Sequence, residues 1–479
     1  MNHQQFSSDA DGRWTYLYAQ KTLSSLIIES KLCLDIMGWN DVSRCRHYAD
    51  KYNLIINKLI DSGTAVPVDP SEINKPEGMV WYLPHHFVEN PNKPGKIRVV
   101  MDCAASFCQV SLNTQLFRGP SLLPKLVGVL LRSRECLFAL SADISAFYHR
   151  INVPSKHQSL QRFVFREFGS NKPLQTYQMT TLVFGAVHAS TAAIWTLQHA
   201  VSKNKNYPEV ASRKKQQNFY ADNLSDSFDT EMEAIKFAKD VTESLAIGGF
   251  KLTSFASSSK RVLETIPTED RAESILDLNY GALPTEYILG LAWDCNSDCY
   301  RLRVKELPPI MTKRELLSAM SREFDPLGIC LPVITYAKLL FQETCKLRTR
   351  ILPYKKPIGW EEPLPECILE KWNTWAGSLS SLSQISIRQC FRSSDEKLAD
   401  CVFHLIVFSG SSLLAFGAVA YLKTTCHGKM HVDFVMAKGR IAPTSILSIP
   451  RLELQAAVLA IRITQSIVRE MRIPISSIE

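Results

Sequence analysis

Short apolar runs alternate with amphipathic stretches along most of this chain of 479 residues. Residues 137–142 are largely apolar and end at Asp143, which predicts a buried strand with an acidic residue at its end. Residues 217–227 predict a β-hairpin, and residues 231–246 have the spacing of an amphipathic helix. Strands that alternate with helices around a central hairpin predict an α+β fold with a mixed or antiparallel sheet.

The same patterns divide the rest of the chain. Additional strands are predicted at 96–102, 403–408, 415–422 and 432–436, and helices at 122–131, 313–323, 334–348 and 450–471. Pro-rich connectors and changes of pattern then predict four parts: a helical segment at 1–75, an α+β region at 76–295, a helical region at 296–395 and a strand-rich region at 396–479.

Composition narrows the class of protein only moderately. The length favours two to four domains, and 46% hydrophobic with 21% charged residues is ordinary for a folded chain. The net charge of +8 allows a polyanionic partner without requiring one. No apolar stretch approaches 18 residues, which predicts that the chain does not cross a membrane.

Thirteen cysteines are scattered through the chain, and no two have C-x-x-C spacing. A zinc site is therefore not expected from the sequence. The odd number of cysteines and the polar N-terminus favour reduced thiols in an intracellular compartment, either cytoplasmic or nuclear.

Two acidic positions suggest chemistry. Asp143 follows one predicted strand, and Asp222 lies at the tip of the predicted hairpin. Two-metal nucleotidyl transfer needs carboxylates held on rigid strand ends, because magnesium prefers fixed oxygen ligands. Taken singly, each position has a simpler interpretation: an Asp after a strand is commonly a helix cap or turn former, and Asp-Asn is a common hairpin pair.

The order of several motifs favours the catalytic interpretation. In chain order they are Arg98, Asp143, Tyr148, Phe184-Gly185, Tyr220-Ala-Asp222 and Ile288-Leu289-Gly290. Their surroundings alternate between strand and helix, as in a polymerase palm. Longer motifs extend the series: Trp81-Tyr-Leu-Pro-His-His86, Ser111-Leu-Asn113, Gly119-Pro-Ser-Leu-Leu123, Gly248-Gly-Phe250, Phe324-Asp-Pro-Leu-Gly328, Ala437-Lys-Gly-Arg440 and Ile449-Pro-Arg-Leu-Glu-Leu454.

With these motifs the chain resembles, over roughly residues 50–479, the polymerase region of a Pao/BEL-type LTR retrotransposon polyprotein. The resemblance implies a right-hand polymerase with fingers and palm at 76–295 and thumb or connection helices at 296–395. It implies a partial ribonuclease H-like α/β domain at 396–479. It also implies a template–primer duplex and deoxynucleoside triphosphates as partners, and Mg²⁺ or Mn²⁺ as the cofactor.

The resemblance also assigns roles to individual residues. Asp143 and Asp222 match metal-binding aspartates, and Ile144 matches a residue that contributes its backbone carbonyl. Three positions match nucleotide-binding residues: Arg98 for the triphosphate, Tyr148 for the sugar, and Phe184-Gly185 beneath the templating base. Leu289-Gly290 matches the pair that positions the primer end.

Two positions depart from the family pattern. Asn223 stands where the family has a second aspartate, which removes a negative charge from the metal site. Gly410 stands at the position of a ribonuclease H aspartate, and Glu453 is one carboxylate where about four are needed. We therefore expect no ribonuclease H activity, and we expect this domain to be incomplete, with an exposed sheet edge.

Two functional hypotheses follow. The chain is either a reverse transcriptase-like polymerase impaired by Asn223 or a catalytically silent nucleic-acid-binding remnant of a decayed or co-opted element. The sequence does not determine the oligomeric state.

Overall fold

The computed structural model describes two compact units, each assembled from separated chain segments. Unit 1 comprises residues 1–123, 144–215 and 240–251, and unit 2 comprises residues 124–143, 216–239 and 252–479. The described residues are 6–8, 14–16, 42–73, 80–89, 95–203, 207, 218–275, 283, 285–348, 356–394, 396–445 and 447–479. None of the helices in this part of the chain is long and apolar enough to cross a membrane.

The predicted helical segment at 1–75 begins mostly outside the described residues. Two short strands, β1 (Phe6–Ser8) and β2 (Trp14–Tyr16), are described there, and the 20-residue helix α2 (Val42–Asp61) follows. The chain then continues into β3 (Ala65–Pro67) and the short helix α3 (Pro70–Ile73).

Unit 1 contains a three-stranded and a two-stranded sheet. The first has the antiparallel order β3-β8-β7, and the second pairs β4 with β5. The further elements of this unit are β4 (His85–Glu89), β5 (Ile97–Met101), α4 (Leu112–Gln115), η1 (Phe147–Arg150), α6 (Ser155–Gln158), η2 (Ser159–Gln161), β7 (Arg162–Phe165), β8 (Gln175–Met179) and α7 (Ala189–Lys203). The strand predicted at 96–102 is β5.

Unit 2 begins with a four-stranded sheet of order β11-β6-β10-β9. Its elements are α5 (Leu126–Arg132), β6 (Phe138–Ile144), β9 (Phe219–Tyr220), β10 (Asn223–Phe228), α9 (Glu231–Ile247), which continues into unit 1, β11 (Leu252–Ser257), α10 (Lys260–Glu264), η3 (Thr268–Asp270) and η4 (Glu273–Ile275). The predicted strand and hairpin are therefore present, and the strand continues one residue beyond Asp143.

A second sheet in unit 2 has the order β12-β13-β14-β15 and is antiparallel. Its strands and the adjacent helices are β12 (Thr285–Ile288), β13 (Leu291–Asp294), β14 (Cys299–Leu302), α11 (Lys313–Met320), α12 (Leu331–Lys346), α13 (Glu366–Ser378), η5 (Leu379–Gln384) and β15 (Ser386–Arg388). Helix α11 starts with a capping box between Thr312 and Glu315 and ends three residues before the predicted end.

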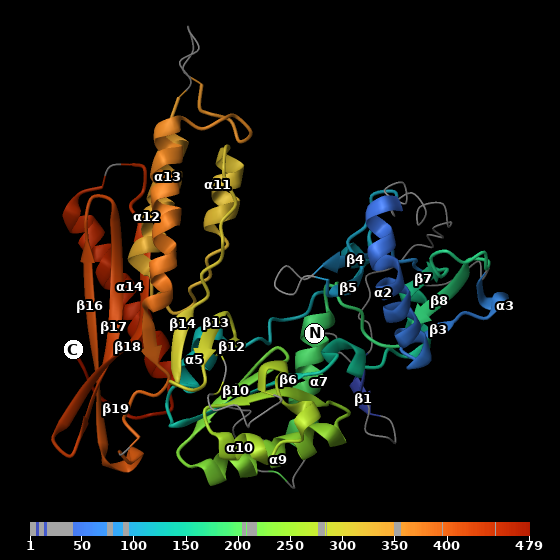
Figure 1. Cartoon of the computed structure of the whole chain (residues 1–479), viewed down its shortest axis with the longest axis horizontal. Coiled ribbons are helices and arrows are strands. Elements are labelled where there is room, and N and C mark those ends of the chain that lie inside the picture. Colours follow the sequence, from blue (N-terminus) through green and yellow to red (C-terminus); the bar gives the residue numbers. More distant parts are fainter. Residues whose placement is uncertain are drawn as a thin grey trace. The chain divides into compact units, whose positions relative to one another are not determined.

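The third sheet of unit 2 has the order β18-β17-β16-β19, with β16 and β19 parallel. Its elements are η6 (Leu398–Asp400), β16 (Cys401–Ser411), β17 (Ala415–Cys426), β18 (Lys429–Ile441), α14 (Ile449–Glu470) and β19 (Ile475–Ile478). Figure 1 shows α14 running along the long strands, and its buried positions Leu452, Ala456 and Ile463 have helical spacing.

One apolar core runs through unit 2. It joins residues of α5 and β6 to the second sheet, the helices α11 to α13 and the third sheet. Two of the sequence motifs meet beside Leu327, which belongs to this core. The Ala437 nitrogen donates to the Leu327 carbonyl at 2.8 Å, and a Cβ on Gly328 would overlap the Ala437 carbonyl. Asp325 caps the start of α12 through the backbone nitrogens of residues 328–330. These motifs thus have a packing role.

Candidate active site

Strand pairing in unit 2 brings the two predicted acidic strand ends together. In the β6–β10 pair, Asn223 lies directly opposite Asp143. Asp222 is the residue just before Asn223 and belongs to the hairpin loop. Ala221 and Asp222 form the two-residue loop of the hairpin because Tyr220 pairs with Asn223. The structure therefore groups Asp143, Asp222 and Asn223 at one end of the sheet.

The backbone of this loop differs from the expectation based on Asp-Asn. Ala221 takes the left-handed conformation, with φ of 54°, whereas neither Asp222 nor Asn223 has a positive φ. A non-glycine residue in this region is uncommon, and such residues gather at functional sites. Ala221 lacks the branched Cβ that makes this conformation most costly.

The Asn223 side chain binds its neighbour. Its Nδ2 atom donates to Oδ1 of Asp222 at 3.0 Å. An aspartate at position 223 could not make this contact, because two ionised carboxylates side by side repel each other unless a cation lies between them. Asn223 therefore lets the hairpin place one acidic side chain at its tip without a counter-ion.

Asp143 is half-buried at the end of β6. Its backbone carbonyl accepts a hydrogen bond from Thr253 Oγ1 at 3.4 Å, and the following Ile144 is 1% exposed. The two carboxylates and one amide at this end of the sheet are oxygen ligands of the kind that a hard divalent cation prefers.

Asp226, on the same strand as Asn223, belongs to a different environment. It is fully buried, and its Oδ1 accepts from Arg472 Nη2 at 2.8 Å while its Oδ2 accepts from Asn218 at 3.1 Å. Both oxygens are thus engaged inside unit 2, so Asp226 does not take the place of the second aspartate that the resemblance leads one to expect at position 223.

The expected nucleotide-binding residues Tyr148, Phe184 and Gly185 meet in unit 1. The rings of Tyr148 and Phe184 pack edge to face with centroids 5.3 Å apart, and the Tyr148 hydroxyl lies 3.2 Å from Ser190 Oγ. Phe184 is 58% exposed, which is unusual for a large apolar side chain and leaves its ring open to a ligand.

Gly185 is required by its surroundings. Its φ is 110°, and a Cβ there would lie 2.8 Å from the Met101 carbonyl at the end of β5. Asn113 fixes the turn, because its side chain bonds the Gly185 carbonyl and the Val187 nitrogen at 3.1 and 2.8 Å. Arg98 lies on β5 as well and is exposed.

Leu289 and Gly290 form the loop between β12 and β13. Both have positive φ, 50° and 93°, as a type I′ hairpin requires. A Cβ on Gly290 would overlap the ring of Phe324. The glycine is therefore needed both for the turn and for contact with the segment that precedes α12.

The residues expected to form a degenerate ribonuclease H site, Gly410 and Glu453, lie in the third sheet and on α14. Gly410 pairs with Gly417 in the β16–β17 register, and Glu453 of α14 reaches the same strand end. Glu453 Oε1 accepts from the nitrogen and hydroxyl of Ser411 at 3.1 and 2.9 Å. A Cβ on Gly410 would meet no atom within 4 Å.

The local sequence patterns gave no indication of a buried ionic network in unit 2. Arg472 Nε donates to Glu135 Oε2 at 2.6 Å, and the same guanidinium binds Asp226. Nearby, Arg132 Nη1 donates to Glu470 Oε2 at 2.9 Å. These partners are 246 to 338 positions apart in the sequence, so no local spacing could have revealed them.

Burial and pairing oppose each other in this network. Burial raises the pKa of Glu135, although the guanidinium of Arg472 acts in the opposite direction. Burial also disfavours the charge of Arg472, but Asp226 and Glu135 together keep its pKa above the ordinary value. Each charge is thus held in place by its partners.

Comparison with known proteins agrees with this architecture. Residues 312–479 match the family model of the Pao retrotransposon-like RNaseH-like domain. No curated protein matches the chain.

Three solved structures of foamy viral protease–reverse transcriptase have a similar fold. The structure of the dRH form with double-stranded DNA has a TM-score of 0.53 at 12% identity, and the match covers 99% of this chain and 67% of that one. The structure with an RNA/DNA hybrid has a TM-score of 0.52 at 13% identity, with 96% and 49% covered. Another structure with double-stranded DNA has a TM-score of 0.51 at 14% identity, with 88% and 72% covered.

At these identities the likeness concerns the fold alone. This chain spans about half the length of the foamy viral chain solved with the hybrid. Residues 312–479 are therefore similar to the Pao retrotransposon-like RNaseH-like domain, in a chain whose fold is similar to that of the foamy viral protease–reverse transcriptase structures.

Proposed function

We propose that this chain is a reverse transcriptase-like protein of a Pao/BEL-type retrotransposon whose nucleotidyl transfer is impaired by Asn223. The observation that carries the proposal is the β6–β10 register, which sets Asp143 directly opposite Asn223, the residue that follows Asp222. The fold similarity to foamy viral reverse transcriptases supports the same conclusion.

Asp143 and Asp222 would hold Mg²⁺ or Mn²⁺, with the backbone carbonyl of Ile144 as a further oxygen ligand. Bound divalent ions activate the attacking hydroxyl and stabilise the charge on the phosphates. The donor set fits one hard cation well, since it offers two carboxylates at one sheet end. A second cation would find a neutral amide at position 223, and that amide is already hydrogen-bonded to Asp222.

The expected loss of nucleotidyl-transfer rate caused by Asn223 follows from the charge that it removes. Removing one partner from a partly desolvated charge cluster costs about 3–5 kcal/mol. Applied to the transition state, this corresponds to roughly two to four decades in rate. The proposed natural activity is therefore weak.

The residues of unit 1 would bind the incoming deoxynucleoside triphosphate. Arg98 has an exposed guanidinium on β5, which suits bidentate binding of phosphate. The edge-to-face contact with Phe184 would keep the Tyr148 ring rigid against the sugar, and Phe184-Gly185 would support the templating base. In unit 2, Leu289-Gly290 would position the primer end of a template–primer duplex.

We propose that the RNaseH-like segment does not cleave RNA. Gly410 supplies no carboxylate, and the Glu453 carboxylate is occupied by Ser411. One carboxylate does not hold two metal ions, so this segment would contribute structure and duplex binding instead.

A second candidate function is a catalytically silent nucleic-acid-binding protein. The hydrogen bond between Asn223 and Asp222 favours it, because this contact stabilises the hairpin without any cation. Both candidates bind a template–primer duplex, and they differ in whether the chain extends the primer.

A primer-extension assay separates the two. The natural chain is compared with Asn223→Asp on the same template–primer, in Mg²⁺ and in Mn²⁺. We expect extension by Asn223→Asp to exceed that of the natural chain by roughly two to four decades. Weak natural extension that disappears in Asp143→Ala supports the impaired polymerase, and extension in the revertant alone supports the silent protein.

Duplex binding provides the control for folding. Both variants should bind the template–primer duplex as the natural chain does, with an affinity that falls steeply as salt rises, because phosphate contacts release counter-ions. If the natural chain does not bind the duplex at low salt, or if Asn223→Asp gains no extension while its binding is intact, the proposal fails.

A further inference from the structure

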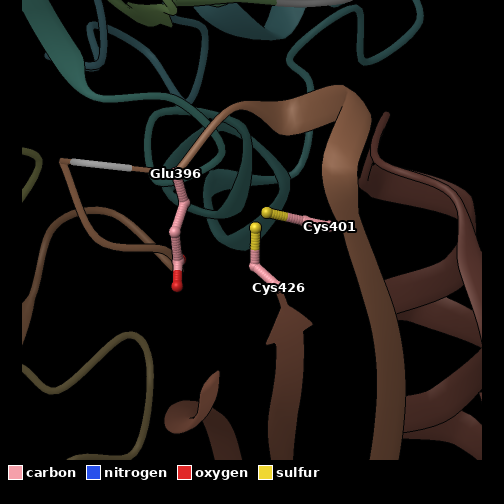
Figure 2. Close-up of side chains that lie close together, drawn as sticks. All are labelled: Glu396, Cys401 and Cys426. Carbon is pink, nitrogen blue, oxygen red and sulfur yellow. The ribbon is translucent and has the colours of Figure 1, made fainter. Parts of the chain in front are cut away.

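Three side chains with metal-binding atoms converge at one end of the third sheet, far along the chain from Asp143 and Asp222. They are Glu396, Cys401 and Cys426, and among the described residues their ligand atoms form one group that lies mutually within 4.8 Å. Figure 2 shows the two sulfur atoms side by side, with the Glu396 side chain next to them on a neighbouring segment.

Strand register creates the cysteine pair. Cys401 is the first residue of β16 and Cys426 is the last of β17, and the two are directly opposite each other. Opposite residues on paired strands project to the same face of the sheet, so the two sulfurs converge. Their separation in sequence hides this arrangement from any test for C-x-x-C spacing.

Hydrogen bonds hold the carboxylate in position. Glu396 is 4% exposed, its Oε2 accepts from the Ser393 nitrogen at 3.0 Å, and its Oε1 lies 2.9 Å from His431 Nε2. His431 Nε2 also lies 3.2 Å from Ser393 Oγ. A carboxylate oxygen has two lone pairs, so each Glu396 oxygen keeps one for a further partner.

From this geometry we propose that Glu396, Cys401 and Cys426 form a binding site for a zinc-class divalent cation, with His431 as the partner that orients the carboxylate. Zinc takes thiolate and carboxylate ligands at about 2.3 and 2.0–2.2 Å, which places ligand atoms under about 4 Å apart in a tetrahedral site. The observed separations need less than about 1 Å of closure. Thiolates select such a soft ion over magnesium, so this site is chemically distinct from the polymerase site.

The charges around the cluster are consistent with a dication. Two thiolates and one carboxylate carry three negative charges, and a divalent ion leaves one. That net charge remains, because the buried guanidinium of Arg392, which donates to the backbone carbonyl of Glu396, is already paired with Asp229. On binding, each thiol releases its proton to solvent, including the Cys401 thiol that donates to the Lys397 carbonyl at 3.2 Å.

The test is a Co²⁺ titration of the full chain, freed of metal and kept reduced with a non-thiol reductant. We expect one Co²⁺ per chain with sulfur-to-cobalt charge-transfer absorption, which added Zn²⁺ displaces. Cys401→Ser and Cys426→Ser should each lose most of this absorption. Cys345→Ser and Cys367→Ser, which alter exposed cysteines, are the matched controls and should retain it.

Two further variants keep the proposal testable if a buried cysteine variant does not fold. Glu396→Gln preserves the size of the side chain and should weaken Co²⁺ binding by ~10-fold or more, and His431→Gln should weaken it by roughly 10- to 100-fold. Excess Zn²⁺ should raise the melting temperature of the natural chain and of the two controls, and raise it less in Glu396→Gln.

Three outcomes would overturn the proposal. The first is charge-transfer absorption that is unchanged in Cys426→Ser, and the second is a melting temperature of the natural chain that does not respond to Zn²⁺. The third is a reduced chain that still lacks two titratable thiols, because a Cys401–Cys426 disulfide would then occupy the site.

Discussion

At the scale of single residues, the glycine and aspartate positions of the β12–β13–β14 hairpins have the clearest physical consequences. Gly290 takes a φ of 93° and contacts the Phe324 ring, and Asp298 takes a φ of 49° in the next turn. Both residue types suit a positive φ, so the backbone conformation by itself favours glycine at 290 and aspartate at 298.

Gly290→Ala should destabilise the chain by roughly 1–3 kcal/mol, because the new Cβ is strained by the backbone and overlaps Phe324. Urea unfolding measures the effect. Gly377→Ala is the matched control, since a Cβ at this exposed helical position meets nothing within 4 Å, and it should cause no loss. Equal stability of the two variants would contradict the steric argument.

Asp298 should make stability fall as pH rises. Burial raises its pKa to about 6 from 3.8, so between about pH 4 and 6 the folded chain holds a proton that the unfolded chain has released. Asp298→Asn should remove this slope and be at least as stable as the natural chain at pH 7. The amide can still accept from Trp293 Nε1 and tolerates the left-handed backbone.

Asp294, on the same hairpin, provides the opposite control. A hydrogen bond from Ser297 lowers its pKa, so it contributes stability at neutral pH that is lost as pH falls through its folded pKa. Unfolding measured across pH 3.5–7 should therefore show slope changes of opposite sign in Asp298→Asn and Asp294→Asn. Slope changes of the same sign would refute the assignment.

At the scale of elements, the strand that begins at Asn223 is held by the C-terminal part of the chain. Asp226 of β10 is bound by Arg472, which follows α14, and Glu135 before β6 binds the same guanidinium. The RNaseH-like segment thus stabilises the strands that carry the candidate active site.

Arg472→Met should cost about 3–5 kcal/mol, because it leaves Asp226 and Glu135 buried without their cation. Urea unfolding again provides the measurement. Lys371→Met removes an exposed partner of Glu343 and should have a much smaller effect on the free energy of unfolding, because solvent screens this pair. A loss in Arg472→Met as small as in this control would show that the network contributes little.

At the scale of the whole molecule, unit 2 should open as one cooperative body, because a single apolar core and the Arg472 network join its three sheets. Hydrogen exchange can test this. In Arg472→Met, peptides that cover β6, β10 and β16 should lose protection together, whereas peptides of β7 and β8 in unit 1 should not change. Loss of protection in β10 alone would indicate that the sheets open independently.

The sequence by itself determined the elements and the composition of the site. The apolar run before Asp143, the hairpin at residues 217–227 and the helix that follows it are encoded by local periodicity, so they were predictable within a few residues. The order of the motifs likewise led to the resemblance to Pao/BEL-type retrotransposons, and a Pao family model matches residues 312–479. The expected departure at Asn223 also follows from the sequence alone.

Only the tertiary structure decided which of these residues meet. The register that places Asn223 opposite Asp143, the burial of Asp226 against Arg472 and the convergence of Cys401 with Cys426 all depend on pairing between segments far apart in the chain. Local patterns carry the period of a strand but not the identity of its partner, because pairing is fixed by how the whole unit buries its apolar faces.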